Sequence, residues 1–171
     1  MRNVIRAAPV LTVLLLAGPV VPALAQGTQG TTGIGWQGWG VRVGASANPD
    51  QLYGGVHFNL GQFAKDVRFR PTVEIGFGDD VTLVQALAEA HYIFSKVQVW
   101  KPYVGGGIGL AYTNRDDDSS GGDDSDTELS LAGVGGIETK LKSGNAFLLE
   151  LKVGLGDDDP DVKFGVGWSF K

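Results

Sequence analysis

The sequence contains no cysteine, which excludes disulfides, thiolate metal sites, cysteine nucleophiles and a lipid-modified N-terminal cysteine. After the first 25 residues it also has no apolar run approaching the roughly 20 residues that a membrane-spanning helix needs. Positive charge is in the minority, with 14 Lys and Arg against 19 Asp and Glu, a net charge of −5. Such an acidic surface repels nucleic acid, so no nucleic-acid partner is expected.

Residues 1–25 have the layout of a secretory signal peptide, with a basic start, an apolar centre and a small-residue end. We expect the segment to be cleaved and the protein to be exported. Without Arg2 and Arg6 the count becomes 12 cations against 19 anions, a net charge of −7. Residues 26–35 are rich in Gly, Thr and Gln and are predicted to be a flexible lead-in, while residues 36–171 form one domain.

Most of this domain alternates between apolar and polar residues with a period of two, which is typical of β-strands. Each alternating segment is about as long as the 9 to 11 residues that a tilted strand needs to cross a bilayer, or slightly longer. An even number of antiparallel strands can close into a ring without edges. The predicted fold is therefore all-β, an eight-stranded antiparallel up-and-down transmembrane β-barrel. The predicted strands are residues 36–46, 51–61, 68–78, 82–94, 101–113, 128–141, 145–156 and 161–170.

The two faces of these strands differ in charge. One face carries large apolar and aromatic side chains without a charge, and the other carries nearly equal numbers of cations and anions, although Leu83 and Leu87 fall on the polar side. Balanced charge favours a closed interior of ion pairs, because an unpaired buried charge is very costly. The predicted interior polar network is Arg42, His57, Arg68, Arg70, Glu74, Glu89, His91, Glu138, Lys140, Glu150, Lys152 and Lys163.

Two other kinds of barrel would show the same alternation of apolar and polar residues along their strands. If the apolar face pointed inward, the chain would be a secreted soluble barrel that binds lipid. If the interior charges left a path for ions, it would be a narrow porin-like channel.

The connections between strands separate by charge. Those joining strands one to two, three to four, five to six and seven to eight hold thirteen aspartates and one arginine, whereas the others are mildly basic. This segregation follows if the strands run up and down in sequence order. The longest loop, residues 114–127, lies at the acidic end, which predicts that this end is extracellular. Candidates for interfacial aromatic girdles are Trp39, Tyr92, Trp100, Tyr103, Tyr112 and Trp168.

The acidic loop partly matches a calcium-binding loop. The weak candidate ligands are Asp116, Asp118, Ser120 and Asp124, but the twelfth position is Thr127 and no flanking helices are predicted. We therefore expect no high-affinity metal site and no cofactor, only divalent cations bound loosely at an acidic rim that bridge it to lipopolysaccharide phosphates.

Two segments carry a family resemblance. Residues 101–112, KPYVGGGIGLAY, and the ending 164–170, FGVGWSF, resemble the OmpA/OmpX-type small outer-membrane β-barrel family. The resemblance implies a Gram-negative outer-membrane location, contact with outer-membrane lipids and lipopolysaccharide, and assembly through a final aromatic residue. That residue is Phe170 here, although Lys171 follows it. We expect a monomer.

Some barrels of this kind are lipid A deacylases or acyltransferases. In this chain Ser95 follows His91 by four residues, which does not match the close His-x-Ser spacing of the deacylases. The expected protein is therefore not an enzyme, but a structural or surface-interacting barrel that presents acidic extracellular loops.

Overall fold

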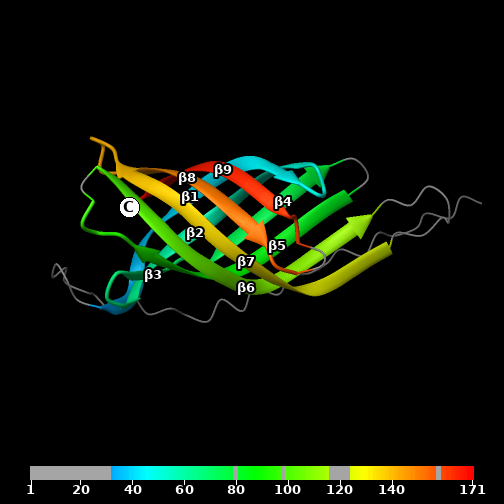
Figure 1. The fold of residues 1–171 in the computed structure, drawn as a ribbon, viewed down its shortest axis with the longest axis horizontal. Helices are drawn as coiled ribbons and strands as arrows, with labels where there is room; N and C mark the ends of the chain where they lie inside the picture. Colours follow the sequence, from blue (N-terminus) through cyan, green and yellow to red (C-terminus); the bar gives the residue numbers. More distant parts are fainter. Residues whose placement is uncertain (1–31, 79–80, 98, 116–123, 157–158) are drawn as a thin grey trace, which may run out of the picture.

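The computed structural model describes residues 32–78, 81–97, 99–115, 124–156 and 159–171, and these residues form β-strands joined by short connections. Within these ranges no helix is long and apolar enough to cross a membrane. The all-β prediction is confirmed (Figure 1). The strands are β1 (Gly33–Ala47), β2 (Gln51–Ala64), β3 (Val67–Phe69), β4 (Thr72–Gly78), β5 (Val81–Ile93), β6 (Trp100–Arg115), β7 (Asp124–Lys140), β8 (Ala146–Gly154) and β9 (Val162–Phe170).

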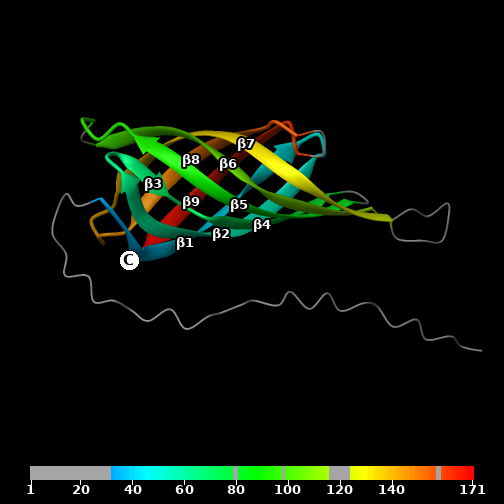
Figure 2. The same ribbon diagram turned by 90° about the horizontal axis from the view of Figure 1, so that it is seen from below.

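The strands close into an antiparallel ring. Successive strands pair with each other, except that β3 and β4 both pair with β2 on one side and β5 on the other. Strand β1 also pairs with β9, from Trp39 opposite Phe170 to Ala47 opposite Val162. Closure is visible in the two perpendicular views, where β9 lies beside β1 (Figures 1 and 2). A closed ring leaves no sheet edge along the paired strands.

Strands β3 and β4 occupy one position of the ring, so the nine strands fill eight positions, as predicted. Both lie between β2 and β5, and the register to β5 is the same on each side of the break. The break falls at Pro71, which has no backbone N–H to donate. The ladder continues around it, because the Arg70 N–H donates to the Glu89 carbonyl at 2.8 Å and the Phe58 N–H donates to the Pro71 carbonyl at 2.9 Å.

Two strands begin three or four residues earlier than predicted. Strand β1 starts at Gly33, inside the segment expected to be a flexible lead-in, because Gly33 and Ile34 pair with the end of β2. Strand β7 starts at Asp124, because its pairing with β6 runs as far as Arg115. Pairing of β7 with β8 ends at Gly154. The β6–β7 hairpin therefore projects beyond the neighbouring strand (Figures 1 and 2).

The barrel is polar inside and apolar outside. In β9, Lys163 is buried whereas Phe164 is 55% exposed, and the same alternation runs through β2, β4, β5 and β8. The exposed apolar side chains reach high values, such as 72% for Leu52. Leu83 and Leu87 are buried in the interior, as their position in the alternation indicates. The described interior is therefore charged rather than apolar, which contradicts the premise of a soluble lipid-binding barrel.

Glycines make room for large interior side chains. A Cβ at Gly40 would collide with the His57 ring, and one at Gly136 would collide with the Tyr103 ring. A Cβ at Gly165 would collide with the Tyr53 hydroxyl. An eight-stranded barrel has an interior just wide enough for its side chains. The glycine content thus allows tyrosine and histidine to fill a narrow lumen.

Aromatic side chains gather on the outside at the end where β1 begins and β9 ends. Their rings contact one another across strands, with centroid separations of 5.2 Å for Trp39 and Phe170 and 5.3 Å for Phe147 and Trp168. Trp100 and Tyr92 lie at the same end. Of the predicted girdle residues, Tyr112 lies instead near the opposite end, and Tyr103 belongs to the interior, where it is 1% exposed.

Candidate functional site

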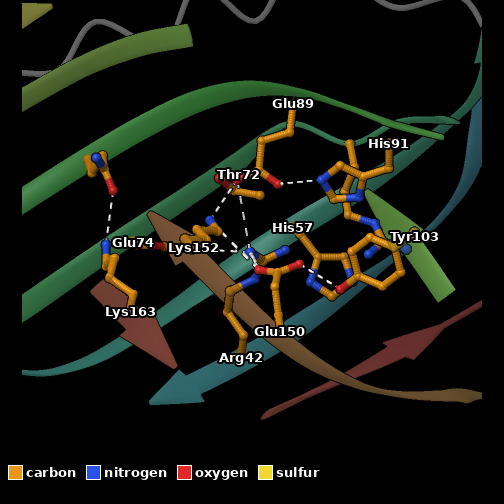
Figure 3. A network of polar contacts seen from close by, with 12 residues as sticks. Arg42, His57, Thr72, Glu74, Glu89, His91, Tyr103, Glu150, Lys152 and Lys163 are labelled. Atoms are coloured by element: carbon orange, nitrogen blue, oxygen red, sulfur yellow. Dashed lines mark hydrogen bonds and ion pairs between the residues drawn. The ribbon is translucent and has the colours of Figure 1, made fainter. Parts of the chain in front are cut away.

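The centre of the barrel is filled by three carboxylates and three cations that face one another (Figure 3). They project inward from five strands: Arg42 from β1, Glu74 from β4, Glu89 from β5, Glu150 and Lys152 from β8, and Lys163 from β9. We call these six residues the central ion-pair network. Each occupies an inward position of its strand, and each is at most 4% exposed.

Glu74 is the most heavily shared carboxylate of the network. Its Oε1 lies 2.6 Å from Lys152 Nζ and 3.2 Å from Arg42 Nη1, and its Oε2 lies 2.8 Å from Lys163 Nζ. Lys152 also donates to Glu89 Oε1 at 2.6 Å, and Arg42 donates to Glu150. Three positive and three negative charges therefore cancel. Such cancellation is needed, because a buried charge without a partner costs several kcal/mol.

Uncharged side chains complete the network. Tyr103 donates its hydroxyl to Glu150 Oε2 at 2.8 Å and stacks on the His91 ring with centroids 5.0 Å apart (Figure 3). His91 Nε2 lies 3.0 Å from Glu89 Oε2, and Thr72 donates to Glu89 Oε1 at 3.0 Å. These contacts satisfy carboxylate lone pairs that the cations leave free.

A second cluster lies toward the end of the barrel that carries the C-terminus. Arg68 holds Glu138 with both Nη atoms, at 2.7 and 2.9 Å. Arg70 donates from Nη2 to the same carboxylate at 3.1 Å and from Nε to Asn59 at 3.0 Å. Two guanidinium groups thus share one carboxylate, which leaves an excess of one positive charge in this cluster.

The opposite end is closed by Asp159, from the connection between β8 and β9. Its Oδ1 accepts hydrogen bonds from Gln85 at 2.9 Å and Ser130 at 2.6 Å, and its Oδ2 accepts one from the Leu131 N–H at 2.9 Å. Gln85 Oε1 in turn accepts from Lys163, which ties this cap to the central ion-pair network.

The structure brings together eleven of the twelve residues predicted for the interior: Arg42, His57, Arg68, Arg70, Glu74, Glu89, His91, Glu138, Glu150, Lys152 and Lys163. Lys140 differs, because it is the last residue of β7 and is exposed at the barrel mouth.

Sequence reasoning missed several polar residues that take part in the interior. Tyr53 and Tyr103 occupy inward positions, so the alternation of sides along a strand would have found them. Gln85 falls on the polar face of its strand in the sequence but was not included in the predicted network. Asp159 lies in a connection, where parity gives no information. Its inward turn is visible only in the structure.

Three interior side chains have the donor atoms that a metal ion needs, but the carboxylate oxygens among these atoms already have other partners. Donor atoms of Glu89, His91 and Glu150 lie within 4.8 Å of one another. Their carboxylates already accept from Lys152, Arg42 and Tyr103, so a metal ion would have to displace those partners. Of the candidate calcium ligands, Asp116, Asp118 and Ser120 lie outside the described residues, and of Asp124 only the backbone is described, at the start of β7.

One serine and histidine pair was not predicted. Ser169 Oγ lies 2.7 Å from His57 Nε2, which is hydrogen-bonding distance. A nucleophilic serine needs a third group that orients the histidine. Among the described residues, His57 Nδ1 has no hydrogen-bond partner, so the pair lacks that orienting acid. We interpret it as part of the interior polar packing.

No protein-family profile and no curated protein matches the sequence, but solved structures do. Neisserial surface protein A is 18% identical with a TM-score of 0.62, and the match covers 80% of this chain and 99% of that chain. The N-terminal β-barrel domain of Pseudomonas aeruginosa OprF is 16% identical with a TM-score of 0.55, covering 80% and 98%. The chain therefore has the fold of the small outer-membrane β-barrels that the sequence resembles.

Proposed function

We propose that the protein is a non-enzymatic integral outer-membrane β-barrel whose role is structural and surface-interacting. The observation that carries this proposal is the division of the barrel into a charged interior, whose central ion-pair network is neutral, and an uncharged apolar exterior. Large exposed apolar surfaces are unfavourable in water and are typical of contact with a partner or a membrane. Here they surround the ring, which supports contact with lipid.

The outer surface also supports a membrane position. Trp39, Trp100, Trp168 and Tyr92 lie outside at one end of the barrel. Tryptophan and tyrosine are enriched at the interface between the hydrocarbon and the headgroups. We place this end at one membrane interface. We assign it to the periplasmic side, because the ends of β6 and β7 that flank the long acidic segment lie at the opposite end.

The interior supports a structural plug rather than a channel. Residues that line a water-filled pore remain accessible to solvent. In the centre of this barrel Arg42 is 1%, Glu89 0% and Lys152 2% exposed. An ion would have to break several of the contacts of Glu74 to pass. We therefore expect the folded barrel not to conduct, and a narrow channel is the outcome that would replace this proposal.

The partners follow from the placement of charge and aromatic residues. The acidic rim would gather divalent cations loosely and bridge them to lipopolysaccharide phosphates. The last strand, ending at Phe170, would be read by the barrel-assembly machinery. Because the ring closes on itself through β1 and β9, it needs no second copy to complete its sheet, and we expect a monomer.

Membrane location and orientation are tested together by single cysteine substitutions, since the chain has no cysteine of its own. Ser125→Cys lies at the acidic end and Ser143→Cys at the other, and both positions are exposed. In intact cells a membrane-impermeant maleimide should label only the first variant, and both should be labelled after lysis. The protein should fractionate with the outer membrane. Recovery in the soluble periplasmic or secreted fraction, or labelling of Ser143→Cys alone, would contradict the proposal.

A further inference from the structure

A cavity of about 670 Å³ opens at the end of the barrel that carries the C-terminus. It is separate from the central ion-pair network. Its charged walls are formed by residues from β3, β6, β7 and the chain end: Arg68, Lys101, Lys140, Lys171 and one carboxylate, Glu138. Val99 and Phe170 add apolar surface to the same walls. The volume lies within the range of about 300 to 1,000 Å³ that is usual for small-molecule sites.

Charge is unbalanced around this cavity. The described side chains that line it carry four cations and one anion. That anion, Glu138, is already held by Arg68 through two hydrogen bonds and by Arg70 through a third. The Glu138 carboxylate is therefore not available to neutralise the three lysines that line the cavity. The central ion-pair network, in contrast, is neutral.

A buried guanidinium stands directly behind the cavity wall. Arg70 is 1% exposed and donates to Asn59 and Glu138, both of which line the cavity. Its Nη1 is buried and has no hydrogen-bond partner within the part of the chain that the structure describes. A buried donor without a partner is costly, more so when it carries charge. An acceptor entering from the cavity would bring compensating negative charge.

From these observations we infer that the cavity binds a small organic phosphate. Guanidinium forks and lysine ammonium groups are the side chains that bind phosphate. Three lysines that Glu138 does not neutralise suit a phosphate better than a single carboxylate, and the apolar walls suit an organic portion. The phosphate can belong to a soluble molecule or to a lipid headgroup, and these two sources differ in the experiment below.

The inference is tested by titrating the refolded barrel with glucose 6-phosphate, using glucose as the uncharged control. The detergent should be a maltoside, because it carries no phosphate, and a heat-dependent gel shift should verify folding of every sample. The test variant is Lys101→Gln/Lys140→Gln. The matched control is Lys65→Gln/Lys96→Gln, which removes the same charge from exposed positions at the same end that do not line the cavity.

We expect saturable binding of glucose 6-phosphate and no binding of glucose. In the test variant the affinity should fall about tenfold or more, because two charge-assisted contacts with the phosphate are lost. The control variant should bind as the unmodified protein does. No saturable binding, or an equal loss of affinity for glucose 6-phosphate in both variants, would overturn the inference. This result does not depend on the cellular location of the protein.

The source of the phosphate is distinguished in nanodiscs. If phosphatidic acid in the disc, whose headgroup is a phosphate monoester like that of the probe, abolishes glucose 6-phosphate binding in the unmodified protein, the site takes a lipid headgroup. If binding persists at the same affinity, the site takes a soluble phosphate.

Discussion

Gly135 and Gly136 are adjacent in β7 but differ in what surrounds them. A Cβ at Gly136 would overlap the Tyr103 ring and the Leu149 carbonyl, whereas one at Gly135 would meet nothing within 4 Å. Tyr103 cannot retreat easily, because it stacks on His91 and donates to Glu150. The interior thus depends on the absence of a single methyl group.

We expect Gly136→Ala to lower the free energy of unfolding by about 1 to 3 kcal/mol, the usual cost of overpacking a filled interior. Gly135→Ala should change it by no more than about 0.5 kcal/mol, as for an unconstrained surface position. Urea unfolding of the barrel in phospholipid vesicles measures both values. Equal effects of the two substitutions would mean that backbone freedom, not space for Tyr103, explains these glycines.

Glu150 and Glu138 lie at different depths inside the barrel. Glu150 lies in the central ion-pair network with a side chain 2% exposed, whereas Glu138 stands at the mouth with a side chain 11% exposed. Glu150→Ala removes one of the carboxylates that neutralise Arg42 in a closed interior. We expect it to lower the free energy of unfolding by about 3 to 5 kcal/mol. We expect Glu138→Ala to lower the free energy of unfolding as well, because the buried Arg70 would lose its carboxylate partner, although water can reach Arg68.

The same unfolding measurement tests both expectations. Asp126→Asn, at an exposed position near the start of β7, serves as the control and should leave the unfolding midpoint unchanged. An unchanged midpoint for Glu150→Ala would refute the interlocked interior.

At the scale of elements, the connection between β8 and β9 closes one end of the barrel through Asp159. We expect Asp159→Ala to release the Leu131 N–H and to speed its hydrogen exchange, because the Asp159 carboxylate is its acceptor. The loss of three hydrogen bonds should also lower stability by about 1 to 3 kcal/mol. Asp161→Ala removes only an exposed contact with Asn48 and should leave Leu131 protected. Equal exchange in the two variants would contradict the role of Asp159 as a cap.

The strands were predictable because polar and apolar residues alternate along them, and because the acidic and basic connections alternate between ends. The predicted strand boundaries were wrong where pairing with another strand sets the first residue. Strand β1 extends back to Gly33 because it pairs with β2, and β7 extends back to Asp124 because it pairs with β6. The break at Pro71 is visible in the sequence, but the ladder bonds that bridge it are not.

In the whole molecule, the alternation of side-chain direction along each strand predicts which side chains point into the barrel. It does not predict which of them contact one another. Arg42 and Glu150 are 108 residues apart and Lys163 and Glu74 are 89 apart, and each pair comes together only because the ring closes. Lys140 shares the parity of the interior residues yet lies at the mouth, because parity carries no information on depth. The phosphate-binding cavity likewise requires the closed ring.

Whether the charged interior plugs a membrane-embedded barrel can be decided by measuring ion conductance in a planar bilayer. The refolded protein, with its heat-dependent gel shift as evidence of folding, should insert and carry no steady current. Steady unitary currents from the folded protein would contradict the account and would make the interior charges the lining of a narrow channel.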